Sequence, residues 1–467
     1  MNFMGIDIGT TSIKTAVFNE KLEELISLSA DYTLDAHGDI VEFDGKQYFE
    51  IVKGEIEKVK KSCSVDALAI DTQCETLILT DEDGTPVRPA IVWLDNRAVE
   101  EAEMIEKKFG HKRVYEVTGQ PEITATWPAA KLLWVKRHEP EVWAKVKKVF
   151  LLEDYILYRM TGKFISEKTL QSSTIYFNIH TGAWWQEMLD FIGVSPDMLP
   201  SLYSSAKEVG TYDGMRVVTG AIDQIAGAIG AGVVGEGLVS VMTGTTMVIF
   251  LPSKGVPAYN EKSIVPCHYN YDDNYCLLSW TPTAGMALKW FKNALCESFS
   301  FRELDTLAEA IAPGSDGLTF LPYLCGSTMP KYNPAARGSF TGLTTEHTRG
   351  HFVRAVMESV ACMLKANLDY LGLDVEEIRV MGGGATSPLW CQMKADMTGK
   401  RLVTLKNKET ACLGSAILAA VGVGAFASVE EAAKLIRLDR EYVSTGADYT
   451  ECYERYLSYD KLLNDPK

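Results

Sequence analysis

The sequence lacks several features that mark whole classes of protein. Its ten cysteines are scattered and never form a C-x-x-C pair, and no basic segment precedes a long apolar run near the start. We therefore expect a cytoplasmic protein with reduced thiols rather than a secreted protein held by disulfides. The seven histidines show no metal-ligand spacing, and no Ser/His/Asp order stands out.

Positive charge is also scarce. The chain has 46 lysines and arginines against 62 aspartates and glutamates, which gives a formal net charge of −16. Because charges of both signs are interspersed, neither nucleic acid nor a membrane surface is expected as a partner. The one segment that could be mistaken for a membrane span, residues 410–428, carries no charge but consists largely of small residues, which predicts a buried helix.

Length and the order of the predicted elements indicate a two-domain α/β protein. A chain of 467 residues exceeds what one hydrophobic core usually organises. Glycines cluster between residues 220 and 237, so we place a first domain at 1–233 and a second at 234–467. The clearest periodic segments are predicted strands at 67–73, 90–95 and 378–381, and predicted helices at 131–138, 184–192 and 351–371.

One supersecondary unit occurs twice, about half a chain apart. Near the start, the strand MNFMGIDIG is followed by a turn at Gly9-Thr10-Thr11 and the strand SIKTAVFN. In the middle, GLVSVM is followed by a turn at residues 243–246 and the strand MVIFLP. Two short strands joined by a glycine turn predict a hairpin, and a repeated hairpin predicts a repeated domain.

The first turn has the residues of a phosphate site. Gly9 lets the backbone approach a ligand, and the amides and hydroxyls of Thr10 and Thr11 can donate to phosphate oxygens. Asp7 is placed to hold Mg²⁺ through water, and Lys14 adds positive charge. The alternative is an ordinary hairpin whose threonines favour β-structure. The second copy of the turn favours phosphate binding, because two such turns can hold the terminal phosphates of a nucleotide.

A glycine loop in the second half predicts a further anion site. Residues 382–384 are three glycines that follow a predicted strand, and Ser387-Pro388 opens a helix. Such a loop lets the backbone approach a nucleotide, and a helix N-terminus favours anions. It is not a G-x-G-x-x-G fingerprint, and a flexible turn remains the alternative.

Several carboxylates are candidates for chemistry. Asp223 follows a strand and begins a helix, so it is either an N-cap or a base for the proton of an attacking hydroxyl. Asp71 and Glu75 flank Gln73-Cys74 at the end of a strand, where they bind sugar hydroxyls or face solvent. Asp95 and Arg97 are open in the same way, because they either contribute to such a site or form an ion pair with each other.

These segments resemble the FGGY family of carbohydrate kinases along nearly the whole chain. The most specific likenesses are GIDIGTTSIK at the start, TATWPAAKLLWVKRH at 124–138 and GSFTGLTTEHTRGHFVRAVMES at 338–359. TGTTMV and MGGGATSPLWCQM add to these, and Thr126 is a small departure. The resemblance implies two actin-like, RNase H-type domains with an ATP cleft between them, and an enzyme that transfers phosphate to an alcohol group.

The resemblance also implies roles for individual residues. It implies ATP and Mg²⁺ as cofactors and Asp223 as catalytic base, with Asp7 and Asp223 near the metal. The residues implied at the nucleotide are Thr10, Thr11, Lys14, Thr245, Gly285, Gly383, Gly384 and Ser387. The residues implied at the sugar are Cys74, Glu75, Trp127, Asp223 and Gln224.

The acceptor is less well defined by the sequence. Glycerol kinases carry an Arg-Glu pair where this chain has Cys74-Glu75, and xylulokinases carry Met-His there. The run from residue 90 to residue 143 is more similar to xylulokinases, so a ketopentose such as xylulose is expected. Glycerol, another polyol or a sugar acid are alternatives, and a non-enzymatic actin-like filament or sugar-sensing protein is an alternative of another class. A homodimer is left open.

Overall fold

The N-terminal hairpin forms as the sequence predicts. The computed structural model describes residues 1–261, 265–372 and 374–464. In it, β1 (Asn2–Ile8) pairs antiparallel with β2 (Ser12–Asn19). The turn between them is closed where the amide of residue 9 donates to the carbonyl of residue 12 at 3.0 Å.

The register of this hairpin sets three charged side chains in one row. β1 also pairs in parallel with β6 (Ala67–Thr72). Asp7 is opposite Lys14 on β2 and opposite Asp71 on β6. Since residues opposite one another in a sheet point to the same face, the two aspartates lie side by side.

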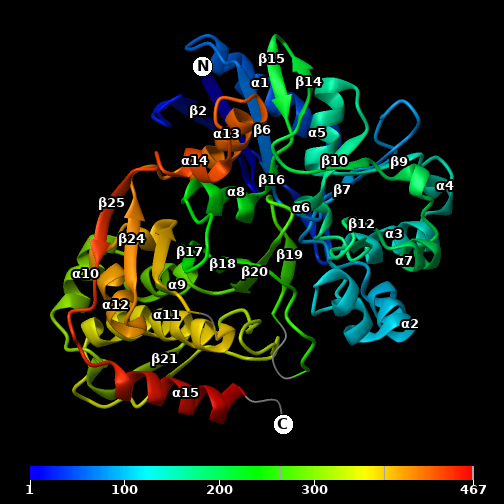
Figure 1. Ribbon diagram of the computed structural model, residues 1–467. Coiled ribbons are helices and arrows are strands. Elements are labelled where there is room, and N and C mark those ends of the chain that lie inside the picture. The colour runs from blue at the N-terminus through cyan, green and yellow to red at the C-terminus, as the bar shows by residue number, and fades with distance from the viewer. Residues whose placement is uncertain (262–264, 373, 465–467) are drawn as a thin grey trace. The chain divides into compact units, whose positions relative to one another are not determined.

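The first sheet extends beyond this core on both sides. Its remaining strands are β3 (Glu24–Asp31), β14 (Glu208–Tyr212), β15 (Met215–Val218) and β16 (Ala221–Ile222). The order is β14-β15-β6-β1-β2-β3, and β16 also pairs with β6 (Figure 1). Ala221 of β16 is opposite Asp71, which brings the start of the next helix to the same edge.

Helices cover both faces of this sheet. On one face, Met4, Ile6 and Ile8 of β1 join a core with α1 (Gly45–Lys60) and α5 (Leu152–Thr161). The other face carries Asp7, because successive strand residues point to opposite sides.

Glycines let two helices approach each other and the Asp7 face closely. The helices are α8 (Asp223–Gly230) and α13 (Thr410–Gly422), the latter drawn in orange in Figure 1. A Cβ on Gly5 would lie 1.8 Å from the Cys412 carbonyl, and one on Gly414 would lie 1.8 Å from the Ala226 carbonyl. α13 is the buried helix predicted within residues 410–428, and no helix in the described ranges is long and apolar enough to cross a membrane.

Smaller elements complete this part of the chain. The five-stranded sheet β4-β5-β8-β7-β9 consists of β4 (Asp35–His37), β5 (Ile40–Phe43), β7 (Leu77–Thr80), β8 (Ala90–Ile91) and β9 (Lys148–Leu151). Other strands are β10 (Ile165–Glu167), β11 (Phe177–Asn178), β12 (Ala183–Trp184), β13 (Ser201–Tyr203) and β19 (Cys267–Tyr269). The helices are α2 (Val99–Thr118), α3 (Pro128–His138), α4 (Pro140–Trp143), α6 (Lys168–Gln171), α7 (Gln186–Ile192), η1 (Pro196–Met198) and α14 (Val429–Ala433).

The second hairpin is built on the same plan as the first. β17 (Leu238–Thr243) pairs antiparallel with β18 (Met247–Ser253) and in parallel with β23 (Glu377–Met381). Its sheet continues in the order β20-β18-β17-β23-β24-β25. The bounds of the added strands are β20 (Tyr275–Thr281), β24 (Arg401–Leu405) and β25 (Leu438–Tyr442).

The helices of this second part are longer on average. They are α9 (Gly285–Leu295), α10 (Phe301–Glu309), α11 (Arg349–Leu371), α12 (Pro388–Thr398) and α15 (Thr450–Asn464), with the short turns η2 (Ser315–Gly317) and η3 (Gly383–Ala385). A short pair of strands, β21 (Thr319–Leu321) and β22 (Ser339–Thr341), packs with them. α11 ends at Gly372 in a left-handed conformation, as predicted from the glycine after the apolar stripe.

The chain divides into two compact units, and each unit is built from three separate segments of the sequence. The first unit consists of Met1–Val234, Pro252–Leu277 and Glu409–Ile436, and the second of Gly235–Leu251, Leu278–Lys408 and Arg437–Lys467. The first of several crossings between the units lies between Val234 and Gly235, and the division into two continuous domains at residue 233 stays a prediction. The later segment of the first unit includes α13, which packs on β1 because its small residues allow close approach.

Several predicted elements differ in extent from the observed ones. The helices predicted from residues 131 and 351 begin earlier, at Pro128 and Arg349. The strand predicted at 90–95 ends at Ile91, because the amide of Asp95 donates to the Val92 carbonyl in a turn. The helix predicted from Trp184 begins at Gln186, because Trp184 pairs with the strand at Phe177. In both cases the backbone next to the regular element makes other hydrogen bonds, in a turn after Ile91 and in a short strand pair before Gln186.

Candidate active site

The first hairpin is fixed by two aromatic side chains. The Tyr32 hydroxyl donates to the Gly9 carbonyl, and the Trp93 indole N–H donates to Thr10 Oγ1 at 3.0 Å. Thr11 stays exposed at the tip of the turn. The backbone of the turn is therefore held rigidly, and the Thr11 hydroxyl remains open to a ligand.

Asp7 lies between a cation and a second carboxyl group. Lys14 lowers the pKa of Asp7, but burial has the larger effect and raises it to about 6. Asp71 is completely buried, and Ser415 Oγ donates to its Oδ2 at 2.6 Å. Burial first, and the charge of Asp7 second, raise the pKa of Asp71 well above its ordinary value. The sequence left open whether Asp71 faces solvent. In the structure, Asp71 is buried beside Asp7.

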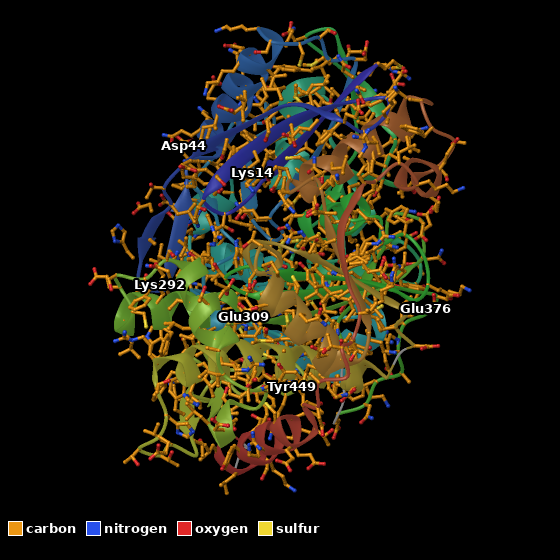
Figure 2. All side chains as sticks on the ribbon, turned by 90° about the vertical axis from the view of Figure 1, so that its left-hand side faces the viewer. Lys14, Asp44, Lys292, Glu309, Glu376 and Tyr449 are labelled. Carbon is orange, nitrogen blue, oxygen red and sulfur yellow. The ribbon has the colours of Figure 1, made fainter. Side chains whose placement is uncertain are left out.

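Lys14 is not an isolated charge. Its Nζ lies 2.7 Å from Glu409 Oε2, and both side chains are partly exposed (Figure 2 labels Lys14). The two residues belong to the same unit, because Glu409 precedes α13. The expected positive charge beside the first turn is therefore shared with a carboxylate.

Asp223 begins α8 without capping it. The N-cap residue is Ile222, and Asp223 Oδ1 accepts from the Gln224 amide at 2.8 Å. Burial, followed by the charge of Asp7, raises the pKa of Asp223 well above its ordinary value. A higher pKa gives this carboxylate a greater affinity for a proton, which suits a general base.

Buried polar residues that the sequence did not single out hold the segment before Asp223. Glu153 Oε1 accepts from the Gly220 amide at 3.0 Å, and Thr169 Oγ1 accepts from the Ile222 amide at 3.0 Å. Thr169 in turn donates to Glu167 at 2.7 Å. No local pattern marks these residues, because they come from elements far from Asp223 in the sequence.

Near the end of β6, several residues that were predicted to bind the sugar lie close together. Cys74 Sγ lies 3.6 Å from Gln224 Oε1 and 4.0 Å from Asp223 Oδ1. Glu75 has a φ of 62°, a left-handed conformation that turns the chain at this point. Burial raises the pKa of Glu75 to about 7, although Lys131 opposes the shift.

Lys131 is the cation of this region. It is fully buried, and its Nζ donates to the carbonyls of Val92 at 2.9 Å and Trp93 at 3.3 Å. Burial lowers the pKa of Lys131 to about 7, while Glu75 acts in the opposite direction. Its N–H groups are largely committed to the backbone.

Trp127 and the predicted ion pair also have defined places. Trp127 stands before α3, and its indole N–H donates to the Glu122 carbonyl at 2.8 Å. Of the two alternatives for Asp95 and Arg97, the ion pair forms, at 2.7 Å, and the Asp95 carboxylate also accepts from the Val41 amide. Asp95 and Arg97 therefore support the fold of this loop.

In the second unit, the hairpin is joined to the start of α9. The Gly285 amide donates to the Gly244 carbonyl at 2.8 Å, and the amides of Ala284 and Met286 donate to the Thr245 carbonyl at 3.0 and 3.2 Å. A Cβ on Gly285 would lie 2.3 Å from the Gly244 carbonyl, so only glycine fits. The Thr245 side chain is exposed at the turn.

The glycine loop packs on the same hairpin. A Cβ on Gly384 would lie 2.6 Å from Thr243 Cγ2, whereas Gly383 is exposed with open space around it. Ser387 is the N-cap of α12, as predicted, and its Oγ accepts from the Trp390 amide at 3.1 Å. The second hairpin therefore contacts both the start of α9 and the glycine loop. These three segments contain Thr245, Gly285, Gly383 and Gly384.

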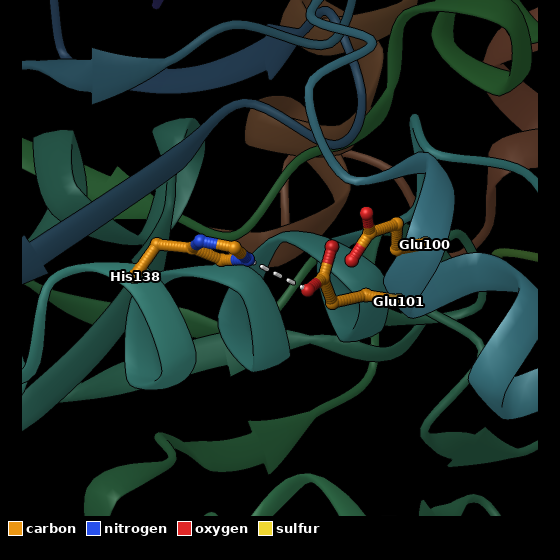
Figure 3. Close-up of side chains that lie close together, drawn as sticks. All are labelled: Glu100, Glu101 and His138. Atoms are coloured by element: carbon orange, nitrogen blue, oxygen red, sulfur yellow. Dashed lines mark hydrogen bonds and ion pairs between the residues drawn. The ribbon is translucent and has the colours of Figure 1, made fainter.

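A separate cluster of side chains has the composition of a metal site. Glu100 and Glu101 lie in the first turn of α2, and Glu101 accepts from His138 Nε2 at 3.1 Å (Figure 3). Arg137 also donates to Glu101. Because an arginine already neutralises this carboxylate, an ion-pair network that joins α2 to α3 explains the cluster.

Known proteins match this chain along nearly its whole length. The models of the N-terminal and C-terminal domains of the FGGY family of carbohydrate kinases match residues 2–232 and 239–423. A xylulose kinase from Staphylococcus epidermidis is 30% identical over 487 residues, which cover 99% of this chain and 97% of that protein. A gluconokinase from Bacillus licheniformis is 28% identical and covers 99% of this chain and 96% of its own length. The ligand-bound xylulose kinase structure from Lactobacillus acidophilus has a TM-score of 0.92 at 25% identity, with 99% and 98% of the two chains covered.

Proposed function

This chain belongs to the FGGY family of carbohydrate kinases, and we propose that its acceptor is a ketopentose such as xylulose. It is accordingly an ATP-binding phosphotransferase with an alcohol group as acceptor, and it has the two-domain α/β fold of that family. Relatives of similar identity carry the names of xylulose kinases and gluconokinases, so the choice between a neutral sugar and a sugar acid rests on the site.

The charge of the acceptor region favours a neutral acceptor. Asp223 and Glu75 carry carboxyl groups there, and the nearby Lys131 donates to two backbone carbonyls. A sugar acid would need a cation to offset its carboxylate, because burying an unpaired charge is expensive. Hydroxyl groups need only donors and acceptors, which Gln224, Glu75 and Cys74 offer. The proposal rests on this observation: the region holds two carboxyl groups, and its cation Lys131 already donates to backbone carbonyls.

The proposed transfer needs one base and little other covalent chemistry. Asp223 accepts the proton of the attacking hydroxyl as its oxygen bonds to the γ-phosphorus, while the bond from that phosphorus to the β–γ bridging oxygen breaks and ADP leaves. The raised pKa of Asp223 supports this role.

The proposed cofactor site fits the donors that the first unit provides. Asp7 and Asp223 offer the hard carboxylate oxygens that Mg²⁺ prefers, with waters between metal and protein. When bound, Mg²⁺ neutralises charge on the phosphates. We propose that the turn residues Thr10 and Thr11, with Lys14 nearby, donate to phosphate oxygens.

We propose that the second unit holds the nucleotide. The exposed Thr245 hydroxyl donates to phosphate, and Gly285, Gly383 and Gly384 allow the backbone to approach the ligand. Ser387 contributes by fixing the N-terminus of α12, where anions are favoured.

The ten free thiols support a reducing compartment such as the cytoplasm.

A coupled ADP-release assay with a panel of acceptors tests the proposal. The panel contains xylulose, ribulose, fructose, glycerol, ribitol and gluconate, each at the same ATP and Mg²⁺ concentrations. We expect the highest kcat/KM with a pentulose. A preference for gluconate would overturn the charge argument, and a rate equal to the blank for every acceptor would favour a non-enzymatic actin-like role, which light scattering with ATP would detect as filaments.

A further inference from the structure

Lys394 is a buried cation, and its contacts within the protein do not explain why a positive charge is placed there. Lys394 lies on α12 with none of its surface exposed, and its Nζ donates to Thr243 Oγ1 at 2.9 Å. The same Nζ lies 4.8 Å from the centre of the Trp390 ring. Thr243 is the last residue of β17, directly before the Gly-Thr turn.

Lys394 has no carboxylate partner in the parts of the chain that the structure describes. The buried Arg354 does have one, because it donates to Glu358 at 2.7 Å. Burial lowers the pKa of Lys394 to about 8, and the one titratable group that opposes this is Cys391, a turn earlier on α12. The groups around Cys391 in turn are Asp305 on α10, Lys408 after β24, and Arg440 on β25. An ammonium ion buried without a counter-charge is unfavourable unless something compensates it.

The position of Lys394 indicates what that compensation is. A Cβ on Gly384 would lie 3.3 Å from its Nζ, so the ammonium lies directly under the glycine loop. Through Thr243 it also contacts the start of the turn that presents Thr245. Both backbone segments are those that the proposed function assigns to nucleotide phosphates.

We propose that the counter-charge of Lys394 is the phosphate chain of the bound nucleotide, and that Lys394 is a positioning residue that acts through Thr243 and the glycine loop. This inference rests on the proposed binding of nucleotide to the second unit. Lys394 does not touch the phosphates, because the glycine loop and Thr243 lie around its head group. It supplies a fixed positive charge at short range in a region from which water is excluded.

The proposal predicts a proton linkage with a definite sign. A nearby anion raises the pKa of an ammonium group, so nucleotide binding raises the pKa of Lys394 above its value in the free protein. Above about pH 8 the free protein has lost this proton, and binding must take it up again. Nucleotide affinity therefore falls as the pH rises through 8, and near pH 7 binding takes up only about 0.1 proton at this site.

Calorimetry of ADP binding in the presence of Mg²⁺ measures this linkage directly. Titrations at pH 7 and pH 9, each in two buffers of different ionisation heat, give the number of protons taken up. For the wild type, a rise of the Lys394 pKa from about 8 to about 9 on binding predicts an uptake of about 0.1 proton at pH 7 and about 0.4 proton at pH 9. At pH 9 the group is about one-tenth protonated in the free protein and about half protonated in the complex. Lys394→Met should take up none at either pH and bind about tenfold more weakly at pH 7, because one unit of pKa shift corresponds to tenfold in affinity.

Two further variants separate charge from packing. Lys394→Arg keeps a charge that does not titrate, so it should bind ADP nearly as tightly as the wild type at both pH values, without proton uptake. Lys365→Met makes the same change at a partly exposed lysine of α11 that is paired with Asp369, and it should match the wild type throughout. If Lys394→Met fails to fold, proton uptake by Lys394→Arg decides the question.

The outcomes distinguish this inference from the function on which it rests. A wild type that binds no ADP at either pH would remove nucleotide binding and the inference together. A wild type that binds ADP, with the same affinity and proton count in Lys394→Met or the same proton count in Lys394→Arg, would overturn the inference alone.

Discussion

Behind the Gly-Thr turn of the first unit lie two carboxyl groups, whereas behind that of the second unit lies a buried lysine. Asp7 and Asp71 are neighbours on parallel strands beside the first turn. Lys394 donates to Thr243 beside the second turn. The two hairpins have the same strand–turn–strand plan and the same pairing with a parallel strand on one side.

The difference teaches that a turn motif does not by itself determine the charge of its ligand. The backbone amides and hydroxyls of both turns can donate to phosphate. Some of the side chains that set the local charge come from other elements. Asp7 belongs to the first hairpin itself, but Asp71 comes from β6 and Lys394 comes from α12. The first hairpin therefore suits a metal-bound phosphate, and the second suits a phosphate chain directly.

The largest expected effect concerns the proposed base, Asp223, whose pKa is raised by burial and by the charge of Asp7 on the first hairpin. Asp223→Asn keeps the shape of the side chain but removes the proton acceptor, so kcat should fall by about 10²- to 10⁴-fold. ADP binding should remain, since the second unit is unchanged. Steady-state kinetics and calorimetry measure the two effects separately.

The matched control for this variant is Asp190→Asn, an exposed aspartate of α7 in the same unit. It should keep the wild-type kcat. Turnover near the wild-type value in Asp223→Asn would remove this residue from the mechanism, and an equal loss in both variants would show a general effect on folding.

Both hairpins could be predicted from the sequence because their signals are local. Alternating strands with a glycine between them specify β1 and β2, and Ser387-Pro388 specifies the start of α12. The residues at the turns were predicted with them, although the roles proposed for Thr11 and Thr245 stay predictions.

The charges behind the turns could not be predicted in the same way. Asp71 meets Asp7 only through the register of β1 and β6, which are separated by more than fifty residues. Lys394 reaches Thr243 across about 150 residues. One signal for Lys394 was present, since it stands among the apolar residues Trp390, Cys391 and Met397 of one helix. A lysine among the apolar residues of a helix that follows a glycine loop agrees with the functional charge that we propose for Lys394.

An intermediate effect is expected for the metal requirement of the first hairpin. Asp7→Asn removes the carboxylate that is proposed to hold Mg²⁺ through water, so the Mg²⁺ concentration for half-maximal rate should rise by about 10- to 100-fold. The rate should recover partly at high Mg²⁺. An unchanged Mg²⁺ dependence in Asp7→Asn would contradict the carboxylate role of the first hairpin and weaken the comparison between the two.

The smallest effect is expected for the hydroxyl of the second turn. Thr245→Val removes one donor to phosphate, worth about 0.5–1.5 kcal/mol, so ADP should bind about 2- to 10-fold more weakly. Thr245→Ser keeps the hydroxyl and should bind as the wild type does, which makes it the matched control. Because Lys394 is intact in Thr245→Val, proton uptake at pH 9 should persist although the affinity is lower. Weaker binding by the serine variant to the same degree would show that the threonine methyl group, and not the hydroxyl, contributes at this turn.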